Sequence, residues 1–290
     1  MINEIKKEIV TKLEKETIFS FLSEGKRIDE RGPYDFRPVN IIPALIKKAE
    51  GSALVELGNT KILAGIKVSP ARPFADEPNK GIFVVNTEFA PVASPIFEPG
   101  PPSEYAIEVA RVVDRAIRSA EMIKLDELVI IPGKLVWMIN IDIYTLDDDG
   151  NLIDASMIGA VSALLTGSIP KVEVIDEEKE EIEIIKEETR PIPIQDIPVT
   201  LTFAKIGNYI VLDPSHIEEN IMDGRLTIAI NQKNQICALQ KGEGGGFKFE
   251  DVLLAKDIAL RKAEELRSII LDHLAKKPRG DEAWEEIRGE

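Results

Sequence analysis

Hydrophobic residues recur at helical spacing in three stretches of the chain, and each stretch predicts an amphipathic helix. The first helix covers the opening of the chain, and Gly25 lies just past its end, where glycine is common. The second spans about Ser103–Lys124 and the third about Phe249–Leu274. A fourth helix is predicted over Asp154–Leu165, with Gly167 as its C-terminal cap.

Between these helices, short runs of alternating hydrophobic and polar residues predict strands. The tight turns Gly58-Asn59 and Gly207-Asn208 each join two strands into a hairpin. Strands, helices, and then strands and a helix again predict an α+β fold with two tandem subdomains of mixed sheet packed with helices. The predicted strands are Ala53–Leu57, Lys61–Val68, Ile82–Phe89, Leu128–Ile131, Leu135–Thr145, Pro198–Lys205, Tyr209–Leu212, Leu226–Ile230 and Ile236–Leu239.

Residues 173–188 combine strand-like alternation with many acidic side chains. They hold nine acidic residues and two lysines. Val172 and Val174 alternate on one side of the charged centre, and Ile182 and Ile184 alternate on the other. We therefore predict a hairpin with an acidic tip between the two halves of the chain, exposed to solvent.

The composition is that of a folded protein, with 44% hydrophobic and 30% charged residues among 290. A formal charge of −15 excludes nucleic-acid binding over the whole surface but leaves room for a local basic site. One cysteine and two histidines provide neither a disulfide framework nor a metal cluster. The sequence shows no secretory signal and no apolar run long enough for a membrane span. We expect a cytoplasmic protein that uses no metal and no cofactor.

Arg111, Arg115 and Arg118 form a narrow stripe along the second predicted helix, because positions i, i+4 and i+7 share one face. Two interpretations of this stripe remain open. It is a solvated face if Glu108 pairs with Arg111, and Asp114 with Arg118. It is a phosphate-binding ridge if the guanidinium groups are free, since their planar fork suits phosphate oxygens. Arg115 has no carboxylate three or four positions away.

Three other segments carry weaker signals. Asp147–Gly150 lacks the ligand spacing of a calcium loop and predicts a turn. Gly242–Gly246 has neither the lysine of a phosphate-binding loop nor the dinucleotide-binding spacing, so we predict a flexible turn. An acidic cluster after a strand is either plain surface or a Mg²⁺ site, and it consists of Asp213, His216, Glu218 and Glu219.

Four segments resemble the RNase PH superfamily, and they are most similar to the non-catalytic RNase PH-like subunits of the archaeal exosome. The segments are GKRIDERGPYDFRPV (25–39), ELGNTKILAGI (56–66), IEVARVVDRAIR (107–118) and VTLTFAKIGNYIVLDPS (199–215). The resemblance spans nearly the whole chain. It implies an RNase PH-like fold with an N-terminal helical extension (1–28) and two subdomains (29–185 and 186–290).

The resemblance also implies a phosphorolytic 3′→5′ RNA-degrading ring. In such a ring three copies of this chain alternate with three copies of a catalytic RNase PH-like subunit, as three heterodimers forming a hexamer. The further partners are RNA-binding cap subunits and the single-stranded 3′ end of an RNA. In active members, an Asp-x-Gly-Ser/Thr-Arg type segment at a helix start binds phosphate, and two aspartates supply the catalytic carboxylates.

Both catalytic elements depart from the family pattern in this chain. The segment Asp154–Met157 keeps a serine, but a Cβ stands where glycine is needed and Met157 replaces the arginine. Asp213 matches the first carboxylate, whereas Glu219 stands at the second. Pro214 removes an amide donor between them. We therefore expect the chain to contribute no catalytic residue.

The RNA-binding arginines match the family better. The resemblance implies that Arg111 and Arg115 hold backbone phosphates beside the neighbour's active site, with Arg118 a weaker candidate. Arg72 is a candidate for the path to that site. The expected function is a non-catalytic subunit of an exoribonuclease ring that binds RNA and structures the adjacent active site. The alternatives are a stand-alone phosphate-dependent 3′→5′ exoribonuclease and a purely structural assembly protein.

Overall fold

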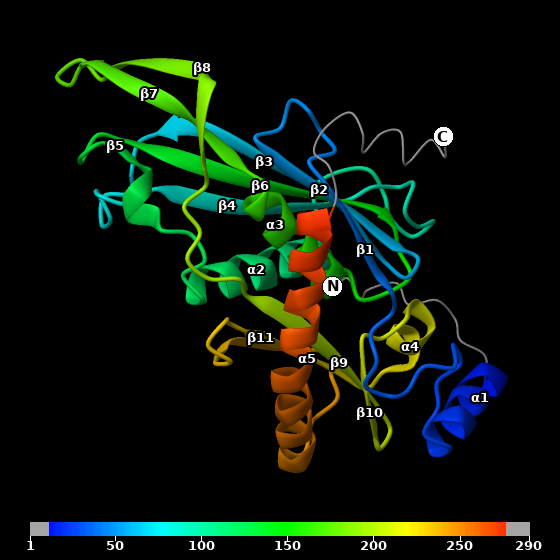
Figure 1. The fold of residues 1–290 in the computed structure, drawn as a ribbon. Helices are drawn as coiled ribbons and strands as arrows, with labels where there is room; N and C mark the ends of the chain where they lie inside the picture. The colour runs from blue at the N-terminus through cyan, green and yellow to red at the C-terminus, as the bar shows by residue number, and fades with distance from the viewer. Residues whose placement is uncertain (1–11, 277–290) are drawn as a thin grey trace.

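The computed structural model describes residues 12–276, in which two sheets enclose a layer of helices (Figure 1). The first elements are α1 (Lys12–Ser23), β1 (Val39–Pro43), β2 (Gly51–Leu57), β3 (Thr60–Ala71), β4 (Ile82–Phe89), α2 (Glu104–Ser119), the 3₁₀ turn η1 (Leu125–Leu128), β5 (Val129–Ile131), β6 (Leu135–Asp147) and α3 (Leu152–Leu165). The others are β7 (Ser168–Asp176), β8 (Glu181–Pro191), β9 (Val199–Ile206), β10 (Tyr209–Leu212), α4 (His216–Ile221), β11 (Gly224–Ile230), β12 (Ile236–Gly242) and α5 (Phe249–Lys276). The predicted α+β class is confirmed.

The larger sheet has the strand order β1-β2-β3-β6-β4, with β5 paired to β6. Its neighbouring strands are antiparallel except β4 and β6, which run parallel. The smaller sheet has the order β10-β9-β11-β12 and is antiparallel throughout. The hairpin at Gly58-Asn59 is confirmed, because Leu57 pairs with Thr60 across a two-residue turn. Gly58 has a φ of +58°, a left-handed conformation that suits glycine.

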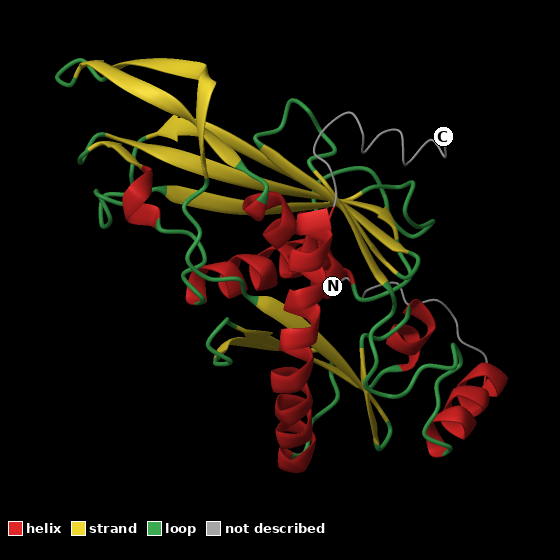
Figure 2. Ribbon diagram, viewed as in Figure 1, coloured by secondary structure: helices red, strands yellow, loops and turns green. Residues whose placement is uncertain are grey.

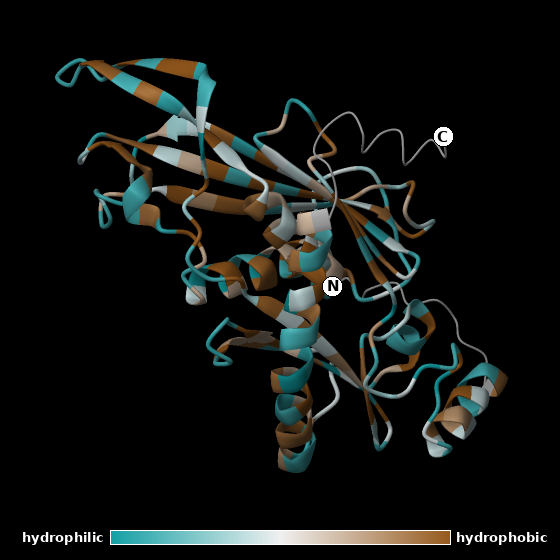
Figure 3. Ribbon diagram, viewed as in Figure 1, coloured by the Kyte–Doolittle hydropathy of each residue, from teal (hydrophilic) through white to brown (hydrophobic). Residues whose placement is uncertain are grey.

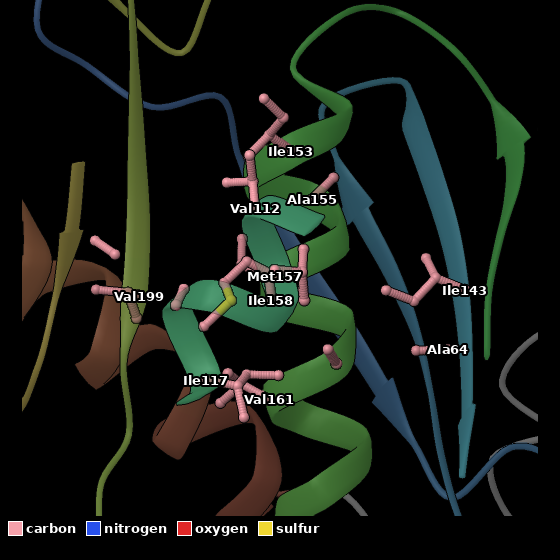
Figure 4. Close-up of a cluster of buried hydrophobic side chains, with 14 of the residues drawn as sticks. Ala64, Val112, Ile117, Ile143, Ile153, Ala155, Met157, Ile158, Val161 and Val199 are labelled. Atoms are coloured by element: carbon pink, nitrogen blue, oxygen red, sulfur yellow. The ribbon is translucent and has the colours of Figure 1, made fainter. Parts of the chain in front are cut away.

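Helix α3 lies between the two sheets, and all but its last residue are buried (Figure 4). It packs on β2 and β3 of the larger sheet and on β9 of the smaller one, so one hydrophobic core serves both halves. The helix begins at Leu152, two residues before the predicted start, because the side chain of Asn151 caps it by accepting a hydrogen bond from the amide of Asp154. Thr166 is the C-terminal cap in place of the predicted Gly167.

Helix α2 packs one face on β4 and α3 and leaves the other face exposed, as its amphipathic pattern predicts. The hydroxyl of Ser103 caps its first turn at 3.2 Å from the amide of Ala106. The helix ends at Ser119, and the predicted extension to Lys124 is wrong. Glu121 takes a φ of +52°, which stops the helix without the glycine that sequence reasoning relies on.

Strands β7 and β8 form a separate two-stranded sheet that projects from the molecule (Figure 2). Val172 faces Ile184 and Val174 faces Ile182, which confirms the predicted hairpin and its register. The alternation of apolar and polar positions along both strands is visible in Figure 3. The division that we predict at residues 185 and 186 falls inside β8.

Helices α1 and α4 pack together with β9 and β10 in a small second cluster, in which Ile18 and Leu22 contact residues such as Ile206 and Ile221. The predicted N-terminal helix is confirmed for Lys12–Ser23, and its first part lies outside the described residues. Helix α4 was not predicted, because six residues are too few to show helical periodicity. No helix in residues 12–276 has the length and apolar character needed to cross a membrane.

We predict that Ile18→Ala lowers the free energy of unfolding by about 2–4 kcal/mol, because Ile18 is only 1% exposed and its removal leaves a cavity between α1 and β9. Chemical denaturation measures this change. Leu13→Ala is the control, since Leu13 is 73% exposed on the same helix and should cost under about 0.5 kcal/mol. Equal effects of the two substitutions would show that α1 does not dock as described.

Candidate functional site

The exposed face of α2 borders a groove of about 680 Å³ that runs between this helix and β4. All three arginines of the predicted stripe lie on this face and line the groove, together with Phe74, Val84 and Ile107. Ala110, which the helical spacing assigns to the buried side, also lines it. The sequence thus predicted the arginine side of this surface but not its apolar side.

Arg118 already has partners within the chain. Its Nη2 lies 2.7 Å from Oδ1 of Asp114, four residues earlier, as the pairing interpretation predicts. Its guanidinium also lies 4.0 Å from the centre of the Phe83 ring, which is a cation–π contact. Arg118 is therefore the least available of the three guanidinium groups.

Glu108, the expected partner of Arg111, pairs instead with a residue far away in the sequence. Oε1 of Glu108 lies 2.7 Å from Nη2 of Arg225, a side chain on β11 that is 3% exposed. The intrahelical pair of Glu108 with Arg111 is therefore wrong, because a buried guanidinium needs a carboxylate more than an exposed one does. A charged residue inside the buried strand Gly224–Ile230 was the one signal in the sequence for this contact.

Within residues 12–276, neither Arg111 nor Arg115 forms an ion pair, a hydrogen bond or a ring contact. Both are exposed, and they lie one helical turn apart. Arginine binds phosphate oxygens two at a time, and two such groups at this spacing can hold an anionic backbone. The pairing expected for a solvated face is thus present for Arg118. The phosphate-binding ridge stays a prediction for Arg111 and Arg115, whose guanidinium groups have no partner within residues 12–276.

The carboxylate of Asp213 is fully buried among positive charges. Oδ1 lies 2.8 Å from Nη2 of Arg37, and Oδ2 lies 2.9 Å from Nη1 of Arg31. Asn151 donates a further hydrogen bond at 2.7 Å. Burial alone would raise the pKa of Asp213, but the hydrogen bond and charge of Arg37, with the charge of Arg31, lower it below the usual value. This carboxylate is charged, paired and shut off from solvent.

The segment Asp154–Met157 lies inside the protein at the start of α3. Its four residues are at most 1% exposed, and Met157 belongs to the hydrophobic core (Figure 4). Both oxygens of Asp154 accept hydrogen bonds from Thr202, each at 2.8 Å. Burial raises the pKa of Asp154 to about 6. The segment therefore presents neither an open amide nor a cation to an anion.

Glu219 and Glu218 have separate roles beside Asp213. Oε1 of Glu219 accepts a hydrogen bond from the amide of Asn151 at 3.0 Å. Burial raises the pKa of Glu219 to about 7, although the nearby charge of Arg225 opposes this shift. Glu218 is buried in an ion pair with Arg27.

The carboxylates of this acidic cluster do not converge. Arg37 and Arg31 hold Asp213, and Arg27 holds Glu218, so the Mg²⁺ alternative has no geometric support. His216 lies 4.0 Å from the carboxylate of Asp148. In residues 12–276 no three His, Cys, Asp or Glu side chains are grouped so that they could hold a metal ion.

Arg72 lies away from the groove lining, on the loop that follows β3. Its Nη2 lies 3.3 Å from Oε2 of Glu180, at the tip of the β7–β8 hairpin. The side chain of Arg72 is 80% exposed. This contact joins the loop to the acidic hairpin, and no spacing in the sequence predicts it.

Two family models match the chain in succession. Residues 35–170 match domain 1 of the 3′ exoribonuclease family, and residues 196–262 match domain 2. The matches cover the larger sheet with α2 and α3, and then the smaller sheet with the first half of α5. The segments with the arginines and with Asp213 thus fall in different domains of one family.

Curated relatives extend this similarity to nearly the full length. The chain is 52% identical over 275 residues to the exosome complex component Rrp42 of Pyrococcus furiosus, which covers 95% of this chain and 99% of the relative. The chain is 46% identical over 263 residues to the protein of the same name from Methanopyrus kandleri, and this match covers 91% of this chain and 97% of the relative.

Solved structures show the same fold. One is described as the Archaeoglobus fulgidus exosome with RNA bound to the active site. One of its chains is 41% identical in sequence to this protein, with a TM-score of 0.81, and the match covers 88% of this chain and 97% of that chain. A chain of an archaeal exosome core is 37% identical with a TM-score of 0.78, covering 89% and 96%. Rice Rrp46, at 16% identity and a TM-score of 0.64, shares the fold.

We predict that the stability of the protein falls as pH rises from 6 to 8, by about 1 kcal/mol from Glu219 alone. The folded pKa of Glu219, about 7, lies above the ordinary value of 4.5, so the folded state holds its proton longer than the unfolded state. The stability that this group contributes is complete below pH 4.5, falls as pH rises through the folded pKa of about 7, and levels off above about pH 8.

Glu219→Gln removes this titration and should flatten the dependence of the unfolding free energy on pH between 6 and 8. Asp154 titrates lower, near pH 6, and is unchanged in the variant. Denaturant unfolding at several pH values measures the difference. An identical slope in both proteins would show that Glu219 is ionised in the folded state at neutral pH.

Proposed function

The chain belongs to the 3′ exoribonuclease family of RNase PH-like proteins, and from this premise we propose that it is a non-catalytic, RNA-contacting subunit of an exosome ring. Two relatives that are 52% identical to this chain over nearly their whole length are exosome complex components named Rrp42. The full-length match, the shared fold and the two family domains support membership of such a complex.

One observation carries the RNA-contacting role. Arg111 and Arg115 are the guanidinium groups on α2 that have no partner in the described part of the chain, residues 12–276, and they line an open groove. Unpaired like charges one turn apart repel each other slightly, so a ligand that supplies negative charge relieves them. A phosphodiester backbone supplies that charge at regular intervals. Arg118 is a lesser contributor because Asp114 and Phe83 already engage it.

The absence of catalysis is argued from what occupies the family's catalytic positions. Asp213 is charged but enclosed by Arg37 and Arg31, so it can neither reach a substrate nor hold a metal ion. Met157 supplies core packing where active members supply a cation for phosphate. These features disfavour the alternative of a stand-alone phosphate-dependent exoribonuclease.

The proposed assembly is a hexameric ring of three heterodimers, in which a catalytic RNase PH-like subunit alternates with this chain. Arg111 and Arg115 would then hold RNA phosphates near the neighbour's active site, for a 3′ end that RNA-binding cap subunits deliver. A structure of an archaeal relative with RNA bound to the active site supports this arrangement. We place the assembly in the cytoplasm.

The purified chain alone, incubated with 3′-tailed RNA and inorganic phosphate, should release no nucleoside diphosphates. The ring reconstituted with the catalytic subunit should release them under the same conditions. Thin-layer or ion-exchange chromatography of the products measures both. Phosphate-dependent release by the chain alone would overturn the non-catalytic assignment and favour the stand-alone enzyme.

In the reconstituted ring, Arg111→Glu with Arg115→Glu should weaken RNA binding and turnover by about 100-fold or more, because two charge-assisted contacts at about 1.5–3 kcal/mol each are lost. Fluorescence anisotropy and phosphorolysis rates measure this loss, and size-exclusion chromatography checks that the ring is intact. The matched control is Lys256→Glu with Arg261→Glu on α5, which changes the charge equally away from the groove. Unchanged binding in the first variant would favour a purely structural subunit.

A further inference from the structure

The groove beside the arginines has an apolar side that the proposed contacts to phosphate leave unexplained. Phe74 is 60% exposed, Ile107 is 48% exposed and Val84 is 37% exposed, and all three line the groove with Arg111 and Arg115. A solvated basic surface has no need of a large exposed aromatic ring there. The groove therefore offers two kinds of chemistry, flat apolar surface and positive charge.

Phe74 is the aromatic side chain of this groove with a ring available to a ligand. Phe83, the other aromatic residue of the lining, is 4% exposed, and the guanidinium of Arg118 already covers its ring at 4.0 Å. The ring of Phe74 takes part in no stacking or cation–π contact within residues 12–276.

The backbone fixes the place of Phe74 at the rim of the groove. The carbonyl of Phe74 accepts a hydrogen bond from the amide of Glu77 at 3.1 Å, which closes a turn at the residue itself. On one side Arg72 is tied to Glu180 of the hairpin, and on the other the amide of Gly81 donates to the carbonyl of Leu125 at 2.7 Å. The backbone on both sides of Phe74 thus makes contacts that place the ring beside the groove.

We propose that Phe74 is a stacking platform for a base of the single-stranded RNA whose phosphates Arg111 and Arg115 hold. A nucleotide combines a flat aromatic base with an anionic phosphate, which matches the two kinds of surface in the groove. Its volume of about 680 Å³ lies within the range of about 300–1,000 Å³ usual for ligand sites. This inference rests on the proposed function and adds a contact to the base.

Two properties follow from the chemistry of stacking. Every base has a π face, so Phe74 binds RNA with little dependence on sequence. In a duplex the faces of the bases are covered by their neighbours, so the platform accepts single strands and rejects paired ones. Phe74 therefore selects the state of the RNA while the arginines provide attraction for any phosphate backbone.

Phe74→Ala in the reconstituted ring tests the proposal, with single-stranded RNA as the probe in fluorescence anisotropy. Loss of one stacked base should weaken binding about 5- to 100-fold. Phe74→Trp keeps a stacking surface and should bind within about twofold of the unaltered ring, and its fluorescence should be quenched by RNA. A weak Phe74→Trp variant without quenching would overturn the platform.

RNAs with a single abasic position separate stacking from other effects. At one position along the RNA, the missing base is the one that stacks on Phe74. With that RNA, Phe74→Ala should change the binding affinity by less than about twofold, because the stacking contact is already absent. An effect of Phe74→Ala that is equal at every abasic position, or absent on intact RNA, would overturn the proposal. So would a ring that fails to assemble with Phe74→Ala, since Phe74 would then belong to a subunit interface.

The charge reversal of Arg111 and Arg115 distinguishes this proposal from the proposed function. That variant should weaken binding to intact and abasic RNAs alike, because it removes contacts to phosphate. If it does so while Phe74→Ala has no effect, the platform fails and the RNA-contacting role stands. If the charge reversal leaves RNA binding unchanged, the RNA-contacting role itself fails and the platform falls with it.

Discussion

A single buried carboxylate determines how the two halves of the molecule are joined. Asp213, at the end of β10, is enclosed by Arg31 and Arg37 from the N-terminal segment and by Asn151 from the cap of α3. Arg37 also donates to the carbonyls of Asp149 and Gly150, so the turn before α3 is fixed by the same group. Removal of one partner from a buried ion pair typically costs about 3–5 kcal/mol, because the other charge is left unsolvated. The position of α3, and with it the shared core, therefore depends on this network.

Ion pairing separates buried arginines of the described chain from two exposed ones on α2. Three buried arginines, Arg27, Arg37 and Arg225, each pair with a carboxylate, and these ion pairs hold distant segments of the chain together. On the groove face of α2, Arg118 is paired with Asp114, whereas Arg111 and Arg115 have no carboxylate partner within residues 12–276. Arg111 is left unpaired because Glu108 pairs with Arg225. Structural pairing in the interior thus leaves positive charge free at the surface. In a chain with a net charge of −15, this explains how a local face of positive charge persists.

Local rules accounted for most of the fold and for part of the site. The hairpin at Gly58-Asn59 and the cap of α2 at Ser103 were predictable because turn and cap chemistry depend on adjacent residues. The end of α2 was not, since Glu121 adopts a left-handed conformation that its side chain does not favour. The pair of Asp114 with Arg118 follows from spacing, whereas that of Glu108 with Arg225 arises only when β11 is brought against α2. Phe74 belongs to no periodic pattern, so only the groove shows what its exposure means.

The docking of α1 has a consequence for how the chain is made. The apolar face of this helix packs on β9, β10 and α4, and Arg27 directly after it forms its buried ion pair with Glu218. Helix α1 therefore meets its partners only after β9, β10 and α4, which begin about 180 residues further along the chain, have been synthesised. During that interval Ile18 and Leu22 are without the surface that buries them, and the long sequence separation of these contacts slows their formation. Synthesis of α4 supplies the last part of that surface, so α1 can dock before β11, β12 and α5 complete the smaller sheet and the shared core.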